Sequence, residues 1–401
     1  MSDGIPLLDL RAEYEPLKER ILAVIAEVLD GMQLYQGRYV KELEERFAAY
    51  CGTRYAIGVG SGTEALMLAL WACGVGPGDE VIVPSLTFIA TPAAAAFLGA
   101  RPVFVDVEPD TCTMDVRQAE AAVTRRTKAI VPVHLYGQTA DMEPIVALAR
   151  RRGLRVIEDA CQAVGAEYGD RRAGSLGDAA AFSFVFTKNL KAYGDAGMVT
   201  TDDEALARRV AMLRDHGRAD KYTHPILGLN CRLDEIQAAI VCLKMDYVEA
   251  WTEGRRRNAG FYSRTLTGSG LGLPHERPGG RHVYHQYVVR SARREALARH
   301  LAERGIATGV HYPVPCHLQE WCLSYGGGPG SLPVSEALSQ EVLSLPVYPE
   351  LTAGQRERVV SAVMEFGAME GAATGPAGSA GSVDRFAEAT ATAAKGGAQW
   401  S

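Results

Sequence analysis

The residues with the most distinctive chemistry in this sequence are a lysine and an aspartate that each follow apolar residues. Lys188 comes just after the apolar run 181–186, although lysine generally prefers solvent. Burial can lower the pKa of such an amine and make it a nucleophile, whereas a loop lysine with a solvated ammonium is the more ordinary alternative. Asp159 ends the run 155–159, where a carboxylate can face a protonated ring nitrogen or a metal, or simply cap the next segment. Gln162, one helical turn later, can reach the same pocket.

Two further motifs have the composition of ligand-binding segments. Ser61, Gly62 and Thr63 lie between an expected strand and an expected helix, where the helix start offers unpaired N–H groups and the glycine permits a close approach. They could form a phosphate cup, although an ordinary helix N-cap is roughly twice as common an explanation for such a motif. Phe88 follows the expected strand 80–83. A phenylalanine there usually belongs to the core, but its ring can also stack on a flat cofactor.

Taken together, these signals match the requirements of pyridoxal phosphate (PLP). PLP needs a lysine for its aldehyde, a carboxylate that keeps its pyridine nitrogen protonated, and donors for its phosphate. Lys188 follows Asp159 by about 30 residues, and the possible phosphate cup and aromatic ring precede both. The protonated ring withdraws electrons and stabilises a carbanion. The sequence therefore predicts a PLP site, while no cluster of cysteine and histidine predicts a metal site.

The elements that must position these residues alternate between strands and helices. Short apolar runs predict strands, and longer helical patterns between them predict helices. The expected strands cover residues 55–59, 80–83, 102–105, 128–133, 155–159, 181–186 and 198–201, and the expected helices 63–73, 91–99, 115–124, 141–152 and 234–247. This alternation predicts an α/β fold in which helices flank a mostly parallel sheet.

The pattern also predicts how the chain is divided. Residues 1–250 are expected to form a large domain that binds PLP and carries an N-terminal arm. Residues 251–368 are expected to form a smaller α+β domain with short strands at 288–289, 309–311 and 343–345. Residues 369–401 are rich in small and polar residues, so we expect a flexible tail of low complexity.

Composition excludes several classes of protein. The chain has 401 residues, 47% of them hydrophobic and 22% charged, which is ordinary for a globular enzyme. Its formal net charge of −6 argues against broad binding of nucleic acid. The sequence has neither a signal-like start nor an apolar run long enough to span a bilayer, and its eight cysteines lack C-x-x-C spacing. We therefore expect a cytoplasmic protein with reduced thiols, no membrane partner and no nucleic-acid partner.

From residue 5 to about residue 366 the chain resembles the DegT/StrS-type sugar-nucleotide aminotransferases, a branch of the fold-type I PLP enzymes. The resemblance rests on many ordered motifs. They are Ser61-Gly62-Thr63, Thr87-Phe88, Glu158-Asp159-Ala160 with Gln162, Ser183-Phe184 with Thr187-Lys188-Asn189, Gly194-Asp195 with Gly197, His216-Gly217, Gly228 with Asn230 and Arg232, His311-Tyr312-Pro313 with His317, and Leu343-Ser344-Leu345-Pro346. Two positions depart from the family pattern: Lys191 stands where a small residue is common, and Ala196 replaces a usual glycine.

The resemblance implies a role for each matching residue. Lys188 would bind the cofactor covalently and move the proton between substrate and cofactor, and Asp159 would pair with the pyridine nitrogen. The remaining cofactor contacts would come from Gln162 beside the phenolic oxygen, Phe88 on the ring face, and Gly62, Thr63 and Ser183 at the phosphate. Asn230 would reach the phosphate of a neighbouring subunit, so the active unit would be a homodimer with shared active sites. His311 and Tyr312 would lie near the sugar.

The resemblance also implies a reaction. An amino acid, L-glutamate in the leading hypothesis, would donate its amino group to a keto-sugar carried by a nucleoside diphosphate, dTDP in that hypothesis, in amino-sugar biosynthesis for a secondary metabolite such as an antibiotic. Since Lys188 is present rather than histidine, amino transfer is favoured over the dehydration that one relative of the family performs. Two alternatives stay open: amination of a ketocyclitol that carries no nucleotide, and a PLP-binding regulator without turnover.

Overall fold

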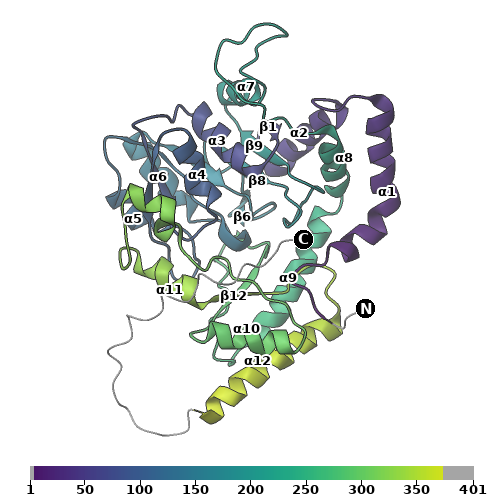
Figure 1. The fold of residues 1–401 in the computed structure, drawn as a ribbon, viewed down its shortest axis with the longest axis vertical. Helices are drawn as coiled ribbons and strands as arrows, with labels where there is room; N and C mark the ends of the chain where they lie inside the picture. The colour runs from purple at the N-terminus through teal and green to yellow at the C-terminus, as the bar shows by residue number, and fades with distance from the viewer. Residues whose placement is uncertain (1–3, 374–401) are drawn as a thin grey trace.

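A seven-stranded sheet forms the centre of the computed structural model, which describes residues 4–373 (Figure 1). Its strands lie in the order β1-β9-β8-β5-β4-β2-β3. β9 is antiparallel to both of its neighbours and the other pairs are parallel, so six of the seven strands run in one direction. The bounds are β1 (Tyr55–Val59), β2 (Glu80–Pro84), β3 (Arg101–Val105), β4 (Thr127–Ile130), β5 (Arg155–Asp159), β8 (Ala179–Ser183) and β9 (Gly197–Thr201). The prediction of a mostly parallel sheet is confirmed.

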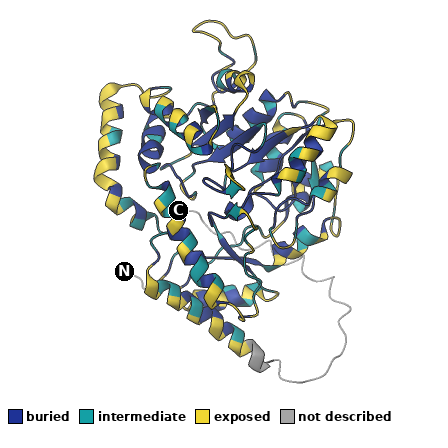
Figure 2. Ribbon diagram, turned by 180° about the vertical axis from the view of Figure 1, so that it is seen from behind, coloured by how far each residue is buried: buried dark blue, intermediate teal, exposed yellow. Residues whose placement is uncertain are grey.

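Helices cover both faces of this sheet because alternate residues of a strand point to opposite sides. Ile157 of β5 packs on the face covered by α3 (Gly62–Ala72), α4 (Ala90–Phe97) and α7 (Glu204–Leu213). On the other face, Val156 packs with α5 (Val116–Ala121) and α6 (Met142–Arg152), and Phe182 of β8 packs with α2 (Arg38–Cys51) and α8 (Glu235–Lys244). α1 (Leu10–Gly31) packs on the outside of α8. Figure 2 shows the result, since the strands are buried while α1 exposes much of its length.

After α8 the chain moves away from the large sheet. α9 (Val248–Thr265) leads to a small antiparallel sheet of β11 (Tyr287–Arg290) and β12 (Val342–Leu345). α9, α10 (Arg294–Glu303) and α12 (Ala353–Ala373) pack with these strands around a separate apolar cluster. The smaller elements are β6 (Glu167–Tyr168), β7 (Arg171–Arg172), β10 (Gly280–Arg281), α11 (Pro333–Glu341), and the 3-10 turns Leu135–Gly137, Cys316–Leu318 and Glu320–Tyr325. The domain boundary predicted at residue 250 falls inside α9 and stays a prediction.

Several details differ from the sequence-based expectation. The strand expected at 128–133 is β4 and ends at Ile130. The expected arm consists of two long helices, α1 and α2, which the strand and helix pattern did not predict. No strand forms at 309–311, where Gly309 makes only an isolated bridge to Ser344. The strand expected at 181–186 ends at Ser183, because the chain leaves the sheet there. α12 extends through Ala373, so residues 369–373 are helical rather than tail; the remainder of the predicted tail, 374–401, lies outside the described residues.

None of the helices within residues 4–373 has both the length and the apolar character needed to cross a bilayer.

Candidate active site

One cavity of about 630 Å³ opens where β1, β2, β5 and β8 end. In an open α/β sheet this edge is where ligands bind, because loops and helix starts converge there. Nine of the ten site residues expected from the sequence line the cavity: Gly62, Thr63, Phe88, Asp159, Gln162, Ser183, Lys188, His311 and Tyr312. Asn230 does not line it. It is exposed and forms a bridge to Asp215. The loop between these two residues extends away from the body beyond α7 (Figure 1).

The start of α3 forms a tight cradle against the end of β8. A Cβ atom added to Gly62 would lie 2.6 Å from Cβ of Ser183 and 3.1 Å from Sγ of Cys161, so no larger residue fits there without a shift. Oγ of Ser61 accepts a hydrogen bond from the amide of Glu64 at 3.2 Å, which is an N-cap. The first amides of the helix, at Gly62 and Thr63, have no intrahelical acceptor, and both residues line the cavity, so this helix start is chemically suited to an anion. The motif is therefore a helix N-cap whose chemistry also suits a phosphate cup, so the two explanations are compatible.

Asp159 is held by a chain of hydroxyl groups. Its Oδ2 accepts a hydrogen bond from Oγ1 of Thr91 at 2.7 Å, and Thr91 lies 2.9 Å from Oγ1 of Thr87. Because a carboxylate only accepts, Thr91 donates to Asp159 and must take its own hydrogen bond from Thr87. Oδ1 accepts from the amide of Cys161 at 3.2 Å, so Asp159 also caps the following turn. The carboxylate is thus fixed on both oxygens at the edge of the cavity.

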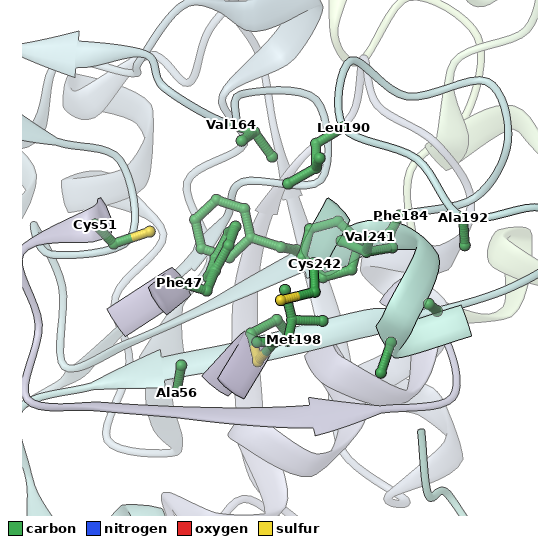
Figure 3. Packing of buried hydrophobic residues seen from close by; sticks show 14 of the residues in the cluster. Phe47, Cys51, Ala56, Val164, Phe184, Leu190, Ala192, Met198, Val241 and Cys242 are labelled. Carbon is green, nitrogen blue, oxygen red and sulfur yellow. The ribbon is translucent and has the colours of Figure 1, made fainter. Parts of the chain in front are cut away.

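Lys188 lies in the lysine loop, residues 184–196, which connects β8 to β9. Phe184, Leu190 and Ala192, from both sides of Lys188, pack in one apolar cluster with Phe47 of α2 (Figure 3). The rings of Phe47 and Phe184 are 5.2 Å apart and nearly perpendicular. Burial lowers the pKa of the Lys188 amine below its ordinary value, while Cys161 and Asp159 oppose the shift. This apolar anchoring directs the amine into the cavity instead of into solvent.

The unusual Lys191 of the same loop is buried and paired. Its ammonium contacts Oε2 of Glu13 in α1, and Lys244 of α8 lies 2.8 Å from Oε1 of the same carboxylate. All three side chains are almost fully buried. The departure from the family pattern therefore creates an ionic link between the lysine loop and the N-terminal helix. Ala196, the other departure, is buried in the apolar cluster.

The opposite wall of the cavity carries aromatic and polar side chains. Phe88 is 53% exposed, so it is not a core residue, and its ring lies 5.8 Å from that of Tyr312. Gln162 donates from Nε2 to the hydroxyl of Tyr312 at 3.2 Å and accepts the amide of Tyr136 at 2.8 Å. Nδ1 of His311 lies 2.8 Å from Oγ of Ser344. Burial lowers the pKa of His311 to about 4, with a smaller contribution from Lys188, so its imidazole is neutral near pH 7.

Among the polar residues of the cavity to which sequence reasoning gave no role are Arg255, His285, Gln286 and Ser344. His285 is buried, and its Nδ1 lies 3.3 Å from Oδ1 of Asn189, the residue after Lys188. Since the amide oxygen only accepts, His285 carries its proton on Nδ1. Burial first, and Lys188 second, keep the pKa of His285 well below its ordinary value. Ser344 belongs to a motif of the resemblance, but no local signal separates the other three from structural residues.

The residues present fit PLP. The Gly62 cradle suits a phosphate, the Asp159 carboxylate suits a ring nitrogen, and the lysine amine shares their cavity. Among residues 4–373, no group of three or more His, Cys, Asp or Glu side chains is arranged to hold a metal ion.

Comparison with known proteins gives consistent matches over nearly the whole chain. The DegT/DnrJ/EryC1/StrS aminotransferase family matches residues 15–364. A pleiotropic regulatory protein of Geobacillus stearothermophilus is 50% identical, with 90% of this chain and 98% of the relative covered. A UDP-N-acetyl-3-dehydro-alpha-D-glucosamine 3-aminotransferase of Acidithiobacillus ferrooxidans is 46% identical, with 90% of this chain and 98% of the relative covered. A dTDP-3-amino-3,4,6-trideoxy-alpha-D-glucose transaminase of Streptomyces venezuelae is 46% identical, with 90% of this chain and 96% of the relative covered.

The fold is also that of a solved enzyme. The crystal structure of DesV from S. venezuelae, in complex with a ketimine intermediate, superimposes with a TM-score of 0.90 at 46% identity. The superposition covers 91% of this chain and 99% of DesV.

Proposed function

The chain belongs to the DegT/DnrJ/EryC1/StrS aminotransferase family, and from this premise we propose that it uses PLP to move an amino group from L-glutamate to a keto-sugar carried by dTDP. The observation that carries the proposal is the meeting of Lys188, Asp159 and the Gly62 cradle in one cavity. These three features come from different strands, and each has the chemistry that one part of PLP requires.

Each cavity residue has a defined task in this proposal. Lys188 would hold the aldehyde of PLP and Asp159 its ring nitrogen, while Phe88 would cover one face of the ring. Gly62, Thr63 and Ser183 would hold the phosphate. Bound there, PLP supplies the carbonyl group that exchanges with the amine and the ring that withdraws electrons from the reacting carbon.

The chain itself supplies the proton transfer. Burial lowers the pKa of Lys188, which favours its neutral amine and allows that amine to accept and return a proton. His285, also neutral, touches Asn189 beside it and adds no second positive charge at this point. Gln162, fixed by the amide of Tyr136, presents its amide group to the Tyr312 hydroxyl at the mouth of the site.

His311 and Tyr312 would contact the sugar. Because His311 is neutral near pH 7, it would act as a hydrogen-bond partner for sugar hydroxyl groups, not as a cation for the diphosphate. The relatives act on both dTDP- and UDP-sugars by their names, so the nucleotide needs a direct test. We expect a mass-spectrometric screen with glutamate as donor to yield an aminated dTDP-sugar. A product from UDP-keto-sugars alone would contradict the dTDP assignment.

We propose a homodimer in which Asn230 of one subunit reaches the phosphate site of the other. Its exposed position away from the cavity of its own chain supports this arrangement. Exposed apolar side chains near it, Tyr222, Leu227 and Leu229, are suited to burial against a second copy. Mixed dimers of Lys188→Ala and Asn230→Ala chains provide the test, since one of the two sites in such a dimer is intact. Activity should return on mixing, and no recovery in verified mixed dimers would contradict sharing.

The covalent assignment can be tested without knowing the sugar. Borohydride reduction of the PLP-loaded protein, followed by peptide mapping, should place the label on Lys188 and not on the nearby Lys191. L-glutamate should remove the absorbance of the lysine-bound cofactor. A label elsewhere, or no spectral response to any amino donor, would overturn the proposal.

A regulatory role is the second candidate, because the Geobacillus relative is named a pleiotropic regulatory protein. A complete set of PLP contacts would be superfluous for a regulator without turnover. Tight, sequence-selective DNA binding in a gel shift at physiological salt, together with no amino transfer, would favour that candidate.

A further inference from the structure

Arg255 of α9 is a buried cation in the wall of the active-site cavity. Its side chain is only 2% exposed, and the residue lines the same cavity as Lys188. It adjoins His285, whose backbone carbonyl it contacts, and His285 in turn contacts Asn189 beside the reactive lysine. Arg255 is thus linked to the reacting centre through His285.

One edge of the Arg255 guanidinium has no partner. Nη1 donates to the backbone carbonyls of Tyr284 and His285, at 3.2 and 3.3 Å. Nε is buried without a hydrogen-bond partner, and both hydrogen bonds that the guanidinium makes to residues 4–373 come from Nη1. Within residues 4–373, no carboxylate lies within 4.0 Å of Arg255. A buried guanidinium without a counter-ion is costly, so this arrangement points to an anion that is absent from the chain itself.

Two acidic residues, Glu13 and Glu350, interact electrostatically with Arg255 without pairing with it. Glu13 is already shared between Lys191 and Lys244. Glu350 is near enough to interact electrostatically, but burial raises its pKa, which disfavours its charged form. Neither carboxylate therefore forms an ion pair with Arg255 within the described residues.

We propose that the Nε–Nη2 edge of Arg255 binds a carboxylate of the amino donor and thereby selects an amino acid as the donor. Two parallel N–H donors match the two oxygens of a carboxylate, a geometry that lysine cannot reproduce. The inference rests on the proposed function only for the identity of the ligand as an amino donor.

Binding of glutarate, the dicarboxylate that resembles glutamate without its amino group, tests the site without any turnover. Calorimetry on the PLP-loaded protein should show that Arg255→Gln lowers the affinity for glutarate by about 10- to 100-fold, because charge-assisted hydrogen bonds are lost. The KM for L-glutamate should rise by a similar factor, while the affinity for PLP stays within about twofold. Arg256→Gln is the matched control, because Arg256 is on the same helix but pairs with Glu276 outside the cavity.

The outcomes separate this inference from the proposed function. Unchanged glutarate binding in Arg255→Gln, or an equal loss of glutarate and PLP affinity, would overturn the carboxylate site. If glutarate binding depends on Arg255 but the wild-type protein never reacts with L-glutamate, the site stands and the proposed function fails. Should Arg255→Gln not fold, Arg255→Lys keeps the charge, and it should still weaken glutarate because the two-pronged geometry is lost.

Discussion

Replacing Thr91 with valine tests whether the hydroxyl chain behind Asp159 supports the cofactor site. Thr91 is 1% exposed, so bulk water does not reach the position of its hydroxyl. The 2.7 Å bond is a hydrogen bond to a charged group, which is worth about 1.5–3 kcal/mol. Valine keeps the shape of threonine, so the change removes the bond while leaving the packing nearly intact.

We expect Thr91→Val to weaken PLP binding by about 10- to 150-fold, which is that free energy expressed as an affinity. The carboxylate would keep only the amide of Cys161 as a partner and would be oriented less firmly toward the ring nitrogen. Titration of the cofactor-free protein with PLP, followed by absorbance, measures the change. Denaturant unfolding of the same protein shows how much of the loss belongs to the fold.

Thr87→Val is the matched control because it removes only the neutral bond to Thr91. Its effect should be smaller, since a bond between two hydroxyl groups contributes about 0.5–1.5 kcal/mol. The reasoning would be refuted if Thr91→Val bound PLP within about twofold of wild type, or if Thr87→Val were the more damaging change.

Three further changes probe other parts of the site. Gly62→Ala should lower the affinity for PLP by at least about tenfold, because the new Cβ would lie 2.6 Å from Cβ of Ser183 and would push the start of α3 away from β8. An unchanged affinity would show that these two segments can separate without loss of binding. Glu13→Gln should lower the free energy of unfolding by about 3–5 kcal/mol, because it leaves buried lysines unpaired. The exposed Glu15→Gln on the same helix should change it by less than about 0.5 kcal/mol, and similar urea midpoints would contradict this difference. The pKa of His311 is about 4 in the folded protein and near its ordinary value in the unfolded chain, so the free energy of unfolding falls as the pH drops from about 6.5 towards 4. His311→Gln should recover up to about 2 kcal/mol of this free energy at pH 4.5 and little at pH 7. An equal effect at both pH values would contradict the pKa shift.

The sequence was most informative where local pattern and position coincide. The strand expected at 155–159 is β5, and its last residue, Asp159, lies at the sheet edge where the alternating pattern required it. Asp159 and Lys188 could be singled out because Asp159 ends one buried strand and Lys188 follows another, and parallel strands bring such ends together.

The remaining features depend on contacts that no local pattern encodes. Helix α1 was missed because charged residues and Pro16 interrupt its apolar positions. The burial of Glu13 in this helix could not be predicted either, because its partners, Lys191 and Lys244, lie far along the chain. Arg255 resembles its neighbours in a basic stretch of α9, and only the packing of the helix beside residues 284 and 285 distinguishes it. A strand at 309–311 was wrong because a single bridge to β12 does not make a ladder.

The position of the lysine loop has a consequence for how the molecule can move. The loop begins and ends on adjacent antiparallel strands, with Ser183 paired to Gly197, so both of its ends are clamped by the same ladder. A connection tied in this way is a poor hinge. Any movement that admits a bulky acceptor should therefore come from the cavity wall that contains His285, His311 and Ser344, while the two ends of the lysine loop stay attached to the sheet.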